Sequence, residues 1–331
     1  MPKYFELRKK IKIILDYLPV SFWLSLGVYI IVLVTYKYFN LPFEATKFYN
    51  FVFLLVTSVT IIFGISFFYY SIDNQEGYLT LQLVKKVVLT TFYFFWRMIP
   101  FFLFVMVYNL IHDVAHLVNG YELDFLLIRI DRMLLFGNSI SLMLEKIITP
   151  WLTSLMATAY SLYFVFFILD PVLHYFAKDK KKFNLVLLSV VLTLYLGLIG
   201  YILVPCVGPI LAQQDGFSKD LILVNGQNYM SRDNAIWGYI NRRGYFHCFP
   251  SLHFGITLVW LYFAWKFWRR KKYLKYVYYL HLPVVLALWL STLYLRWHYL
   301  IDWVGGFVVA VLGIWLAYVV DGWWNKRVDK L

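Results

Sequence analysis

Two short segments near the C-terminus carry residues that could do chemistry. His253 lies at the edge of an apolar run in the segment 248–255, and His298 opens a second run that contains Asp302. His298 and Asp302 are four residues apart, so a helix would stack them on one face. A carboxylate beside an imidazole fixes its tautomer and raises its basicity. We therefore expect His298 to act as a nucleophile and His253 as a proton donor to a leaving group.

The composition indicates a membrane protein. Of 331 residues, 62% are hydrophobic, 21% are aromatic and only 15% are charged, whereas soluble globules usually have about 25% charged residues. Apolar windows that can cross about 30 Å of hydrocarbon predict about eight transmembrane helices. The expected spans are roughly 18–38, 48–70, 89–110, 151–176, 183–205, 252–268, 275–295 and 299–320. The expected fold is an all-α polytopic membrane protein.

These spans predict an N-terminal addition followed by a core. Residues 1–88 hold a basic leader and two additional spans, which carry no polar cluster beyond scattered Ser and Thr. Residues 89–331 hold six spans and both histidines, together with the segments 111–150 and 206–251 between spans. Within 111–150, apolar and charged residues alternate at helical spacing over 124–137. This pattern predicts an amphipathic helix on the outer interface.

The distribution of charge predicts the orientation in the membrane. The chain carries a net charge of +13, and its basic clusters are residues 3–12, 85–86, 178–182, 269–275 and 326–327. With a cytoplasmic N-terminus and about eight crossings, every cluster falls on the cytoplasmic side, as the positive-inside rule requires. We interpret the charge as a topology signal with anionic-lipid contact and expect no nucleic-acid partner. Both termini are then cytoplasmic, and both histidine segments reach the extracytoplasmic face.

No cleavable signal peptide is evident, because the first apolar run is too long for a signal sequence and has no small-x-small cleavage site. We expect this run to be retained as a transmembrane span.

The candidate residues suit a phosphate ester held at the outer membrane face. His298 would attack phosphorus while Asp302 orients it, and His253 would protonate the departing oxygen. The product is a phosphohistidine that a second nucleophile resolves. Phosphoryl oxygens need cationic or N–H donors, for which the nearest candidates are Arg296, Arg242, Arg243 and Ser251 at the expected start of a helix. This scheme requires no metal or other cofactor.

Other polar residues allow more than one interpretation. The possible contacts to a headgroup or acceptor are Asp113, Asp131, Arg132 and Tyr201. The charged members of this set can instead form interfacial salt bridges. His112 and His116 have the i, i+4 spacing of a metal-binding pair, but no neighbouring Cys or further His supplements them, so we expect no metal site.

The two cysteines, Cys206 and Cys248, both fall in the segment 206–251. In an oxidising exterior they can pair and clamp the loop before His253. The alternative is two unpaired thiols, of which Cys248 behaves as a small buried residue.

The motifs resemble those of the type-2 phosphatidic acid phosphatase superfamily. Pro250-Ser251-Leu252-His253 matches the Pro-Ser-x-His block of that family. Its third block is Ser-Arg, five residues, His, three residues, Asp; here Ser291-Thr292 takes the place of the first pair, and His298 and Asp302 match the rest. The first block has no match, and residues 201–209 occupy its place. The resemblance covers about residues 90–320 and implies a six-helix phosphatase-like core with His253 as proton donor, His298 as nucleophile and Asp302 as relay carboxylate.

One branch of that family is more similar than the others. The Pro-Ser-Leu-His form, Thr292, Asp131-Arg132 and Phe136-Gly137 are similar to the branch that contains fungal inositol phosphorylceramide synthase. This resemblance implies transfer of a phospho-headgroup between lipids, for example inositol phosphate onto a ceramide-like alcohol. The partners would be a phospholipid or lipid phosphate, a lipid-alcohol acceptor and the bilayer.

Three other functions stay open. A lipid-phosphate phosphatase of the phosphatidate or polyprenyl phosphate type would use the same three residues, but it would admit water where a transferase excludes it. A lipid transporter or scramblase is a remote alternative, because the sequence has no inverted repeat or paired broken helices of the usual kind. An inactive interaction protein that has kept the fold is the last alternative.

Overall fold

The structure is a computed structural model that describes residues 19–41, 49–73, 81–177, 179–229, 247–272 and 274–328. Over these ranges the regular secondary structure is helical, and the β-pairing is limited to an isolated bridge between Ile222 and Asn228. The expectation of an all-α fold is confirmed.

Long apolar helices dominate the described residues. They are α2 (Val20–Tyr38), α4 (Leu81–Val118), α7 (Pro150–Phe176), α8 (Lys180–Leu203), α12 (Leu274–Tyr294) and α13 (Leu300–Val328). Six helices of the described chain are long and apolar enough to cross a membrane. These segments are helical because hydrocarbon offers no partner for unpaired backbone groups, so each N–H and C=O must be paired within its own segment.

Two further helices correspond to expected spans. α3 (Tyr49–Asp73) contains the shorter apolar stretch Leu55–Ser71. α11 (Leu252–Trp268) has 17 residues, a length of about 25 Å. The chain is therefore a polytopic membrane protein, and the number of eight crossings stays a prediction. Large apolar side chains such as Ile31, Phe164 and Trp315 are exposed, as expected of helix faces that meet lipid.

The chain forms two compact units. Unit 1 comprises Met1–Leu110, Pro171–Val191 and Ala317–Leu331, and unit 2 comprises Ile111–Asp170 and Leu192–Leu316. Within unit 1, the Tyr36 hydroxyl donates to the Leu110 carbonyl at 3.1 Å, and Arg97 donates to Asn184 Oδ1 at 2.6 Å. Unit 2 contains both histidine segments.

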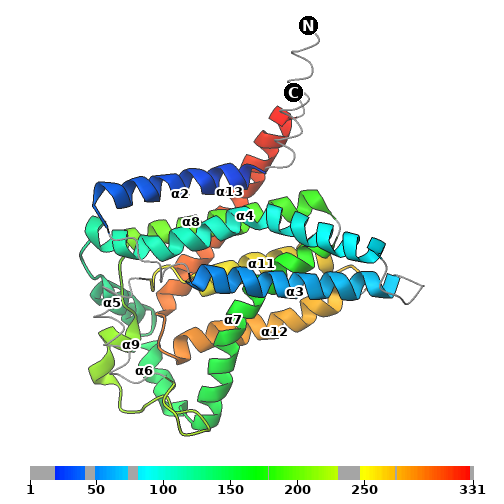
Figure 1. Cartoon of the computed structure of the whole chain (residues 1–331). Helices are drawn as coiled ribbons and strands as arrows, with labels where there is room; N and C mark the ends of the chain where they lie inside the picture. The colour runs from blue at the N-terminus through cyan, green and yellow to red at the C-terminus, as the bar shows by residue number, and fades with distance from the viewer. Residues whose placement is uncertain are drawn as a thin grey trace. The chain divides into compact units, whose positions relative to one another are not determined.

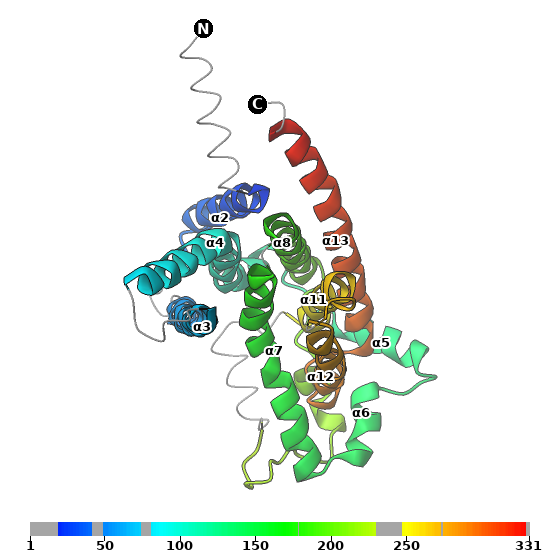
Figure 2. The ribbon, with the colours of Figure 1, turned by 90° about the vertical axis from the view of Figure 1, so that its right-hand side faces the viewer.

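Short elements gather at one end of unit 2. They are α5 (Asp124–Leu134), α6 (Ile140–Leu144), η2 (Glu145–Ile147), α9 (Pro209–Ala212) and η3 (Gln214–Gly216). α11 begins and α12 ends at this same end (Figures 1 and 2). α5 is the amphipathic helix that the sequence predicts: Phe125 and Met133 are exposed, whereas Asp124 and Asp131 are buried. Its location at a membrane interface stays a prediction.

Glycines bring α11 and α13 into close contact. A Cβ atom added to Gly306 would lie 2.5 Å from the Ser251 carbonyl oxygen, and one added to Gly255 would lie 3.0 Å from the Gly306 carbonyl oxygen. Because only glycine allows backbones to approach so closely, these two positions let the start of α11 reach the start of α13. His253 and Asp302 stand on those two helix ends.

Candidate active site

His298 and Asp302 form a hydrogen-bonded pair where α12 connects to α13. His298 Nδ1 lies 3.0 Å from Asp302 Oδ2, which also accepts from the Tyr299 backbone N–H at 2.8 Å. Asp302 is fully buried. When Asp302 is ionised it only accepts hydrogen bonds, and the proton of a neutral His298 then lies on Nδ1. The Nε2 atom then carries a free lone pair, as a nucleophile requires.

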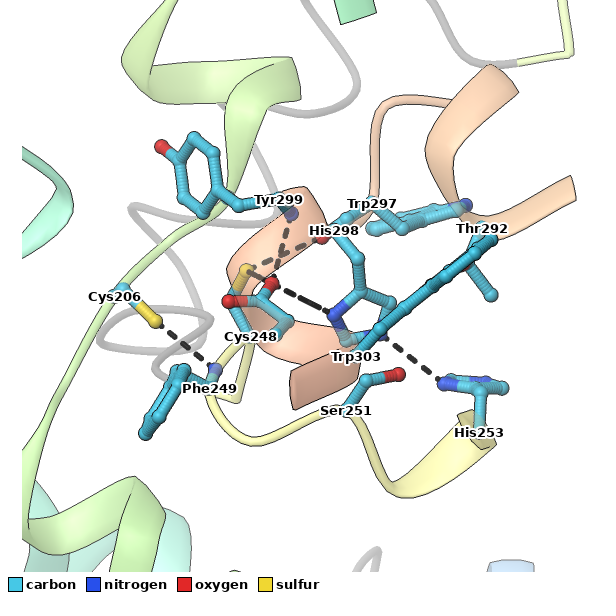
Figure 3. Close-up of polar contacts among 12 residues, drawn as sticks. Cys206, Cys248, Phe249, Ser251, His253, Thr292, Trp297, His298, Tyr299 and Trp303 are labelled. Atoms are coloured by element: carbon cyan, nitrogen blue, oxygen red, sulfur yellow. Dashed lines mark hydrogen bonds and ion pairs between the residues drawn. The ribbon is translucent and has the colours of Figure 1, made fainter. Parts of the chain in front are cut away.

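The second histidine stands opposite this lone pair. His253 lies in the first turn of α11, and its Nδ1 is 3.3 Å from His298 Nε2 (Figure 3). Ser251 caps α11, since its hydroxyl accepts from the Phe254 N–H at 3.4 Å. The Ser251 N–H donates to the Asp302 carbonyl at 3.0 Å. The structure therefore brings together His253, His298 and Asp302, and Ser251 links the two helices. Phosphate binding by Ser251 stays a prediction.

A left-handed turn at the end of α12 positions His298. The Trp297 N–H donates to the Thr292 carbonyl at 3.0 Å, and the Arg296 N–H donates to the Leu293 carbonyl at 3.1 Å. This pairing is a Schellman motif, in which the residue after the C-cap adopts the left-handed conformation and is usually glycine. Here that residue is Arg296, with φ of 65°. The His298 N–H also donates to the Thr292 carbonyl, at 3.2 Å.

The Arg296 side chain has partners other than the histidines. Its Nη2 donates to the Lys219 carbonyl at 2.7 Å and to Glu145 Oε1 at 3.3 Å, and its guanidinium lies 3.8 Å from the centre of the Phe217 ring. Arg296 is 7% exposed. These contacts hold the strained turn, and phosphate binding by Arg296 stays a prediction. Thr292 donates to the Trp289 carbonyl and accepts from Trp303 Nε1 at 3.1 Å.

Asp131 caps α13 from another helix. Its two carboxylate oxygens accept from the Leu300 and Ile301 N–H groups, both at 2.8 Å. The side chain is 1% exposed. Burial raises the pKa of Asp131, and the two backbone hydrogen bonds oppose this rise. Both oxygens thus support the helix that carries Asp302, and the possible headgroup contact of Asp131 stays a prediction.

A second buried carboxylate from α5 supports the same region. Asp124 accepts from the Val207 and Gly208 N–H groups at 2.9 Å each and from the Tyr299 hydroxyl at 2.7 Å. Burial is the main cause of the raised pKa of Asp124. The sequence did not single out this residue. The only indication in the sequence was that Asp124 belongs to the polar face of the predicted amphipathic helix.

The other candidate residues either lie apart from these contacts or fall outside the part of the chain that the structure describes. Arg132 lines an open groove of about 720 Å³ on α5, together with Phe125, Arg129 and Phe136. Tyr201 is buried in α8. Arg242 and Arg243 fall outside the described residues, as do the side chains of Asp113, His112 and His116.

Two tyrosines that the sequence analysis missed flank His253. The ring centres of Tyr163 and Tyr160 on α7 lie 4.3 and 4.8 Å from that of His253. These contacts pack the His253 ring against α7. The tyrosines are three residues apart on one helix face, but nothing in the sequence of α7 shows which helix that face meets.

Both cysteines are free thiols in the structure. The Cys248 thiol donates to Asp302 Oδ2 at 2.7 Å, and Cys206 Sγ accepts from the Phe249 N–H at 3.1 Å. Burial raises the pKa of both thiols. Of the two alternatives from the sequence, the structure has the unpaired thiols, and it adds a contact between Cys248 and Asp302.

Burial lowers the pKa of His298 below its usual value of about 6.5. The imidazole is only 3% exposed, and transfer out of water disfavours its charged form. His298 is therefore neutral near pH 7. A neutral imidazole with Nδ1–H bonded to Asp302 is the protonation state in which Nε2 can attack an electrophile.

A comparison with protein families matches the part of the chain that contains this site. A family model described as the PAP2 superfamily matches residues 126–316. This range runs from α5 into α13 and contains both histidines and Asp302. Searches of curated proteins and of solved structures find no match to the chain.

Proposed function

The chain belongs to the PAP2 superfamily, and from this premise we propose that it is an integral membrane phosphotransferase that moves a phospho-headgroup between lipids through a phosphohistidine. Family membership supports a lipid phosphatase or phosphotransferase type of function. The reaction, the substrate and the roles of individual residues are our proposal. The observation that carries it is the chain of contacts from Asp302 through His298 to His253.

In the first half-reaction, His298 Nε2 forms a bond to phosphorus as the ester P–O bond breaks. The imidazole becomes positively charged, and Asp302 stabilises it through Nδ1–H. His253 gives its proton to the departing alkoxide, so that a neutral alcohol leaves. In the second half-reaction, His253 takes the proton of an incoming hydroxyl, whose oxygen attacks the phosphohistidine and releases His298.

The two histidine rings are in direct contact in the structure. A gap of 3.3 Å is too short to hold phosphorus between His298 Nε2 and a leaving oxygen beside His253. Binding of a lipid phosphate must therefore separate the two rings. The flanking rings of Tyr160 and Tyr163 can keep His253 oriented during this movement.

The surroundings of the histidines favour a lipid alcohol over water as the second nucleophile. His253 lies between the rings of Tyr160 and Tyr163, and Tyr160 is also stacked at 6.1 Å on Trp297, the residue before His298. A site lined in this way holds little water, which protects a phosphohistidine from hydrolysis. Inositol phosphate and a ceramide-like alcohol are the proposed headgroup and acceptor, from the motif resemblance. Hydrolysis of a lipid phosphate by the same residues is the alternative.

We also propose that the site lies on the extracytoplasmic side. α11 runs from His253 to the basic turn that begins at Arg269, and α12 returns from Lys275 to the site. The catalytic end and the basic turn are thus at opposite ends of a helical hairpin. The positive-inside rule assigns the basic turn to the cytoplasm, which leaves the histidines on the other side.

Turnover in liposomes tests the proposal. The purified protein is incubated with a phospholipid labelled in its phosphate, with and without a ceramide or diacylglycerol acceptor. We expect a new labelled lipid that appears only with acceptor, and its loss in His298→Ala. Release of the labelled phosphate into water without acceptor, as inorganic phosphate from a lipid monophosphate or as the headgroup phosphate from a phosphodiester lipid, would indicate hydrolysis. Lipid movement without any product would indicate a scramblase, and full activity of His298→Ala would exclude the proposed nucleophile.

A further inference from the structure

Three side chains of types that bind metal ions lie close together, and one of them is the proposed nucleophile. Cys248 Sγ, His298 Nδ1 and Asp302 Oδ2 lie within 4.8 Å of one another, and all three residues are buried. The other carboxylate oxygen, Asp302 Oδ1, is buried and has no hydrogen-bond partner among the described residues. We propose that Cys248, His298 and Asp302 form an inhibitory binding site for a thiophilic divalent ion such as Zn²⁺.

The three atoms lie close enough together for one zinc ion to reach them all. Sγ and Oδ2 are 2.7 Å apart, Nδ1 and Oδ2 are 3.0 Å apart, and Sγ and Nδ1 are 3.9 Å apart. The circle through the corners of a triangle with these sides has a radius of about 2.0 Å, and its centre lies inside the triangle. Zinc binds nitrogen and oxygen at about 2.0–2.2 Å and sulfur at about 2.3 Å, so an ion slightly above this plane reaches all three ligands.

The ligand types select the ion. Thiolate and imidazole favour Zn²⁺ and related transition metals, whereas Mg²⁺ and Ca²⁺ prefer oxygen ligands alone. Asp302 Oδ1, which has no other partner in the described structure, is available as a further oxygen ligand. The Tyr299 N–H that holds Asp302 Oδ2 supplies the outer hydrogen bond that commonly orients a metal-bound carboxylate.

A metal ion bound at this site would prevent His298 from acting as the nucleophile. A metal ion on Nδ1 displaces the proton that His298 otherwise shares with Asp302. That proton moves to Nε2, and the Cys248 thiol loses its proton to solvent, so one proton is released for each ion bound. His298 is then protonated on the atom that should attack phosphorus, and Asp302 no longer orients it. This inhibition rests on the proposed function, whereas the binding of the ion does not.

Burial predicts how inhibition would develop. Cys248 is 4% exposed and Asp302 is fully buried, so an ion must enter through a local opening of the structure. We therefore expect inhibition that builds up over time and reverses slowly when a chelator is added. A metal that merely bound the lipid phosphate would act as soon as it was mixed.

The test uses the two neighbouring buried cysteines as a matched pair. Cys248→Ser keeps a hydroxyl beside Asp302 but removes the sulfur ligand, and Cys206→Ser makes the same change at a thiol outside the triad. Co²⁺ replaces Zn²⁺ as a spectroscopic probe, because a thiolate bound to Co²⁺ gives a charge-transfer absorption. Turnover is measured as the ratio with and without Zn²⁺ within each variant, with Mg²⁺ as the control ion.

We expect the charge-transfer band and slow Zn²⁺ inhibition in the wild type and in Cys206→Ser. Since loss of an outer-shell partner already weakens metal binding about 10–100-fold, Cys248→Ser should bind at least about tenfold more weakly. His298→Ala should also lose affinity, and size-exclusion elution checks that each variant is folded. No band in the wild type, or an equal band in Cys248→Ser, would overturn the site.

The two proposals fail in different ways. A wild-type protein that shows the Cys248-dependent band but no turnover of any lipid phosphate retains the metal site and refutes the proposed function. One that shows the band and full turnover with Zn²⁺ bound refutes inhibition.

Discussion

His298 Nδ1 lies 3.0 Å from Asp302 Oδ2 although His298 precedes the helix that carries Asp302. The pair is therefore not an ordinary contact between neighbouring turns of one helix. His298 sits on the turn after α12, and α13 begins only at Leu300. The geometry of the pair thus depends on the turn at Arg296 and on the cap at Asp131 as much as on its own spacing.

Replacing Asp302 with Asn should remove the orientation of His298. The amide keeps the size of the side chain but presents an N–H as well as an oxygen, so His298 can adopt the wrong tautomer. Loss of the corresponding carboxylate in a serine protease triad costs about 10⁴-fold in kcat, and we expect a loss of roughly 10³–10⁴-fold in turnover of the lipid substrate. Asp179→Asn, at a partly exposed ion pair with Lys182, is the control. A loss under tenfold in Asp302→Asn would contradict the relay.

The pH profile should reflect the lowered pKa of His298. A lowered pKa keeps the imidazole neutral down to more acidic pH, so the nucleophile is lost only as pH falls through that lower value. The acid limb of kcat/KM, which reports ionisation of the free enzyme, should lie below about 6.5. A phosphodiester lipid is the suitable substrate, because it lacks the second phosphate ionisation near about pH 6. An acid limb above 6.5 would contradict the effect of burial.

His253 should matter only when the leaving group needs a proton. A lipid alkoxide is a poor leaving group, so His253→Ala should reduce its transfer by about 10²–10⁴-fold, the usual contribution of general acid catalysis. A nitrophenyl phosphate ester departs without protonation, and its turnover should fall far less. The ratio of the two rates within each protein is the measurement. Equal losses on both substrates would assign His253 to substrate binding rather than to proton donation.

Local patterns in the sequence predicted much of the fold. The ends of the expected spans at 18–38, 151–176 and 275–295 fall within two residues of α2, α7 and α12, because composition changes sharply where a helix leaves hydrocarbon. Helical periodicity predicted α5. The spacing of His298 and Asp302, together with the even number of crossings between His253 and His298, predicted that these residues would meet.

Tertiary hydrogen bonds could not be predicted in this way. For Asp131 the sequence left open a headgroup contact or an interfacial salt bridge, whereas its partners in the structure are the backbone N–H groups of Leu300 and Ile301. Every sequence contains backbone N–H groups, so no pattern marks them. Arg296 was expected to bind phosphate because it is basic and near His298. The sequence did not reveal its left-handed backbone conformation, because such a turn is normally marked by a glycine and here the residue is an arginine.

Asp131 should act on stability and turnover together. Removing a side-chain cap from a helix N-terminus costs about 0.5–2 kcal/mol, and Asp131→Ala leaves two buried N–H groups without their acceptors. We expect a lower unfolding midpoint in detergent and a lower kcat, because the cap lies one and two residues before Asp302. Asp131→Asn, which keeps one oxygen acceptor, should show a smaller loss of both. If Asp131 bound the headgroup instead, KM would rise while the unfolding midpoint stayed constant.

Arg296 allows the strain of its turn to be measured. Both Arg296→Ala and Arg296→Gly lose the contacts to Glu145, Lys219 and Phe217, so their difference reports the backbone alone. At φ of 65°, a residue with a Cβ atom is strained by about 1–2 kcal/mol, whereas glycine is not, although glycine gains freedom in the unfolded chain. We expect the glycine variant to unfold at a higher denaturant concentration than the alanine variant and to retain more activity, because His298 follows this turn directly. An alanine variant as stable as the glycine variant would mean that the turn relaxes when the guanidinium contacts are removed.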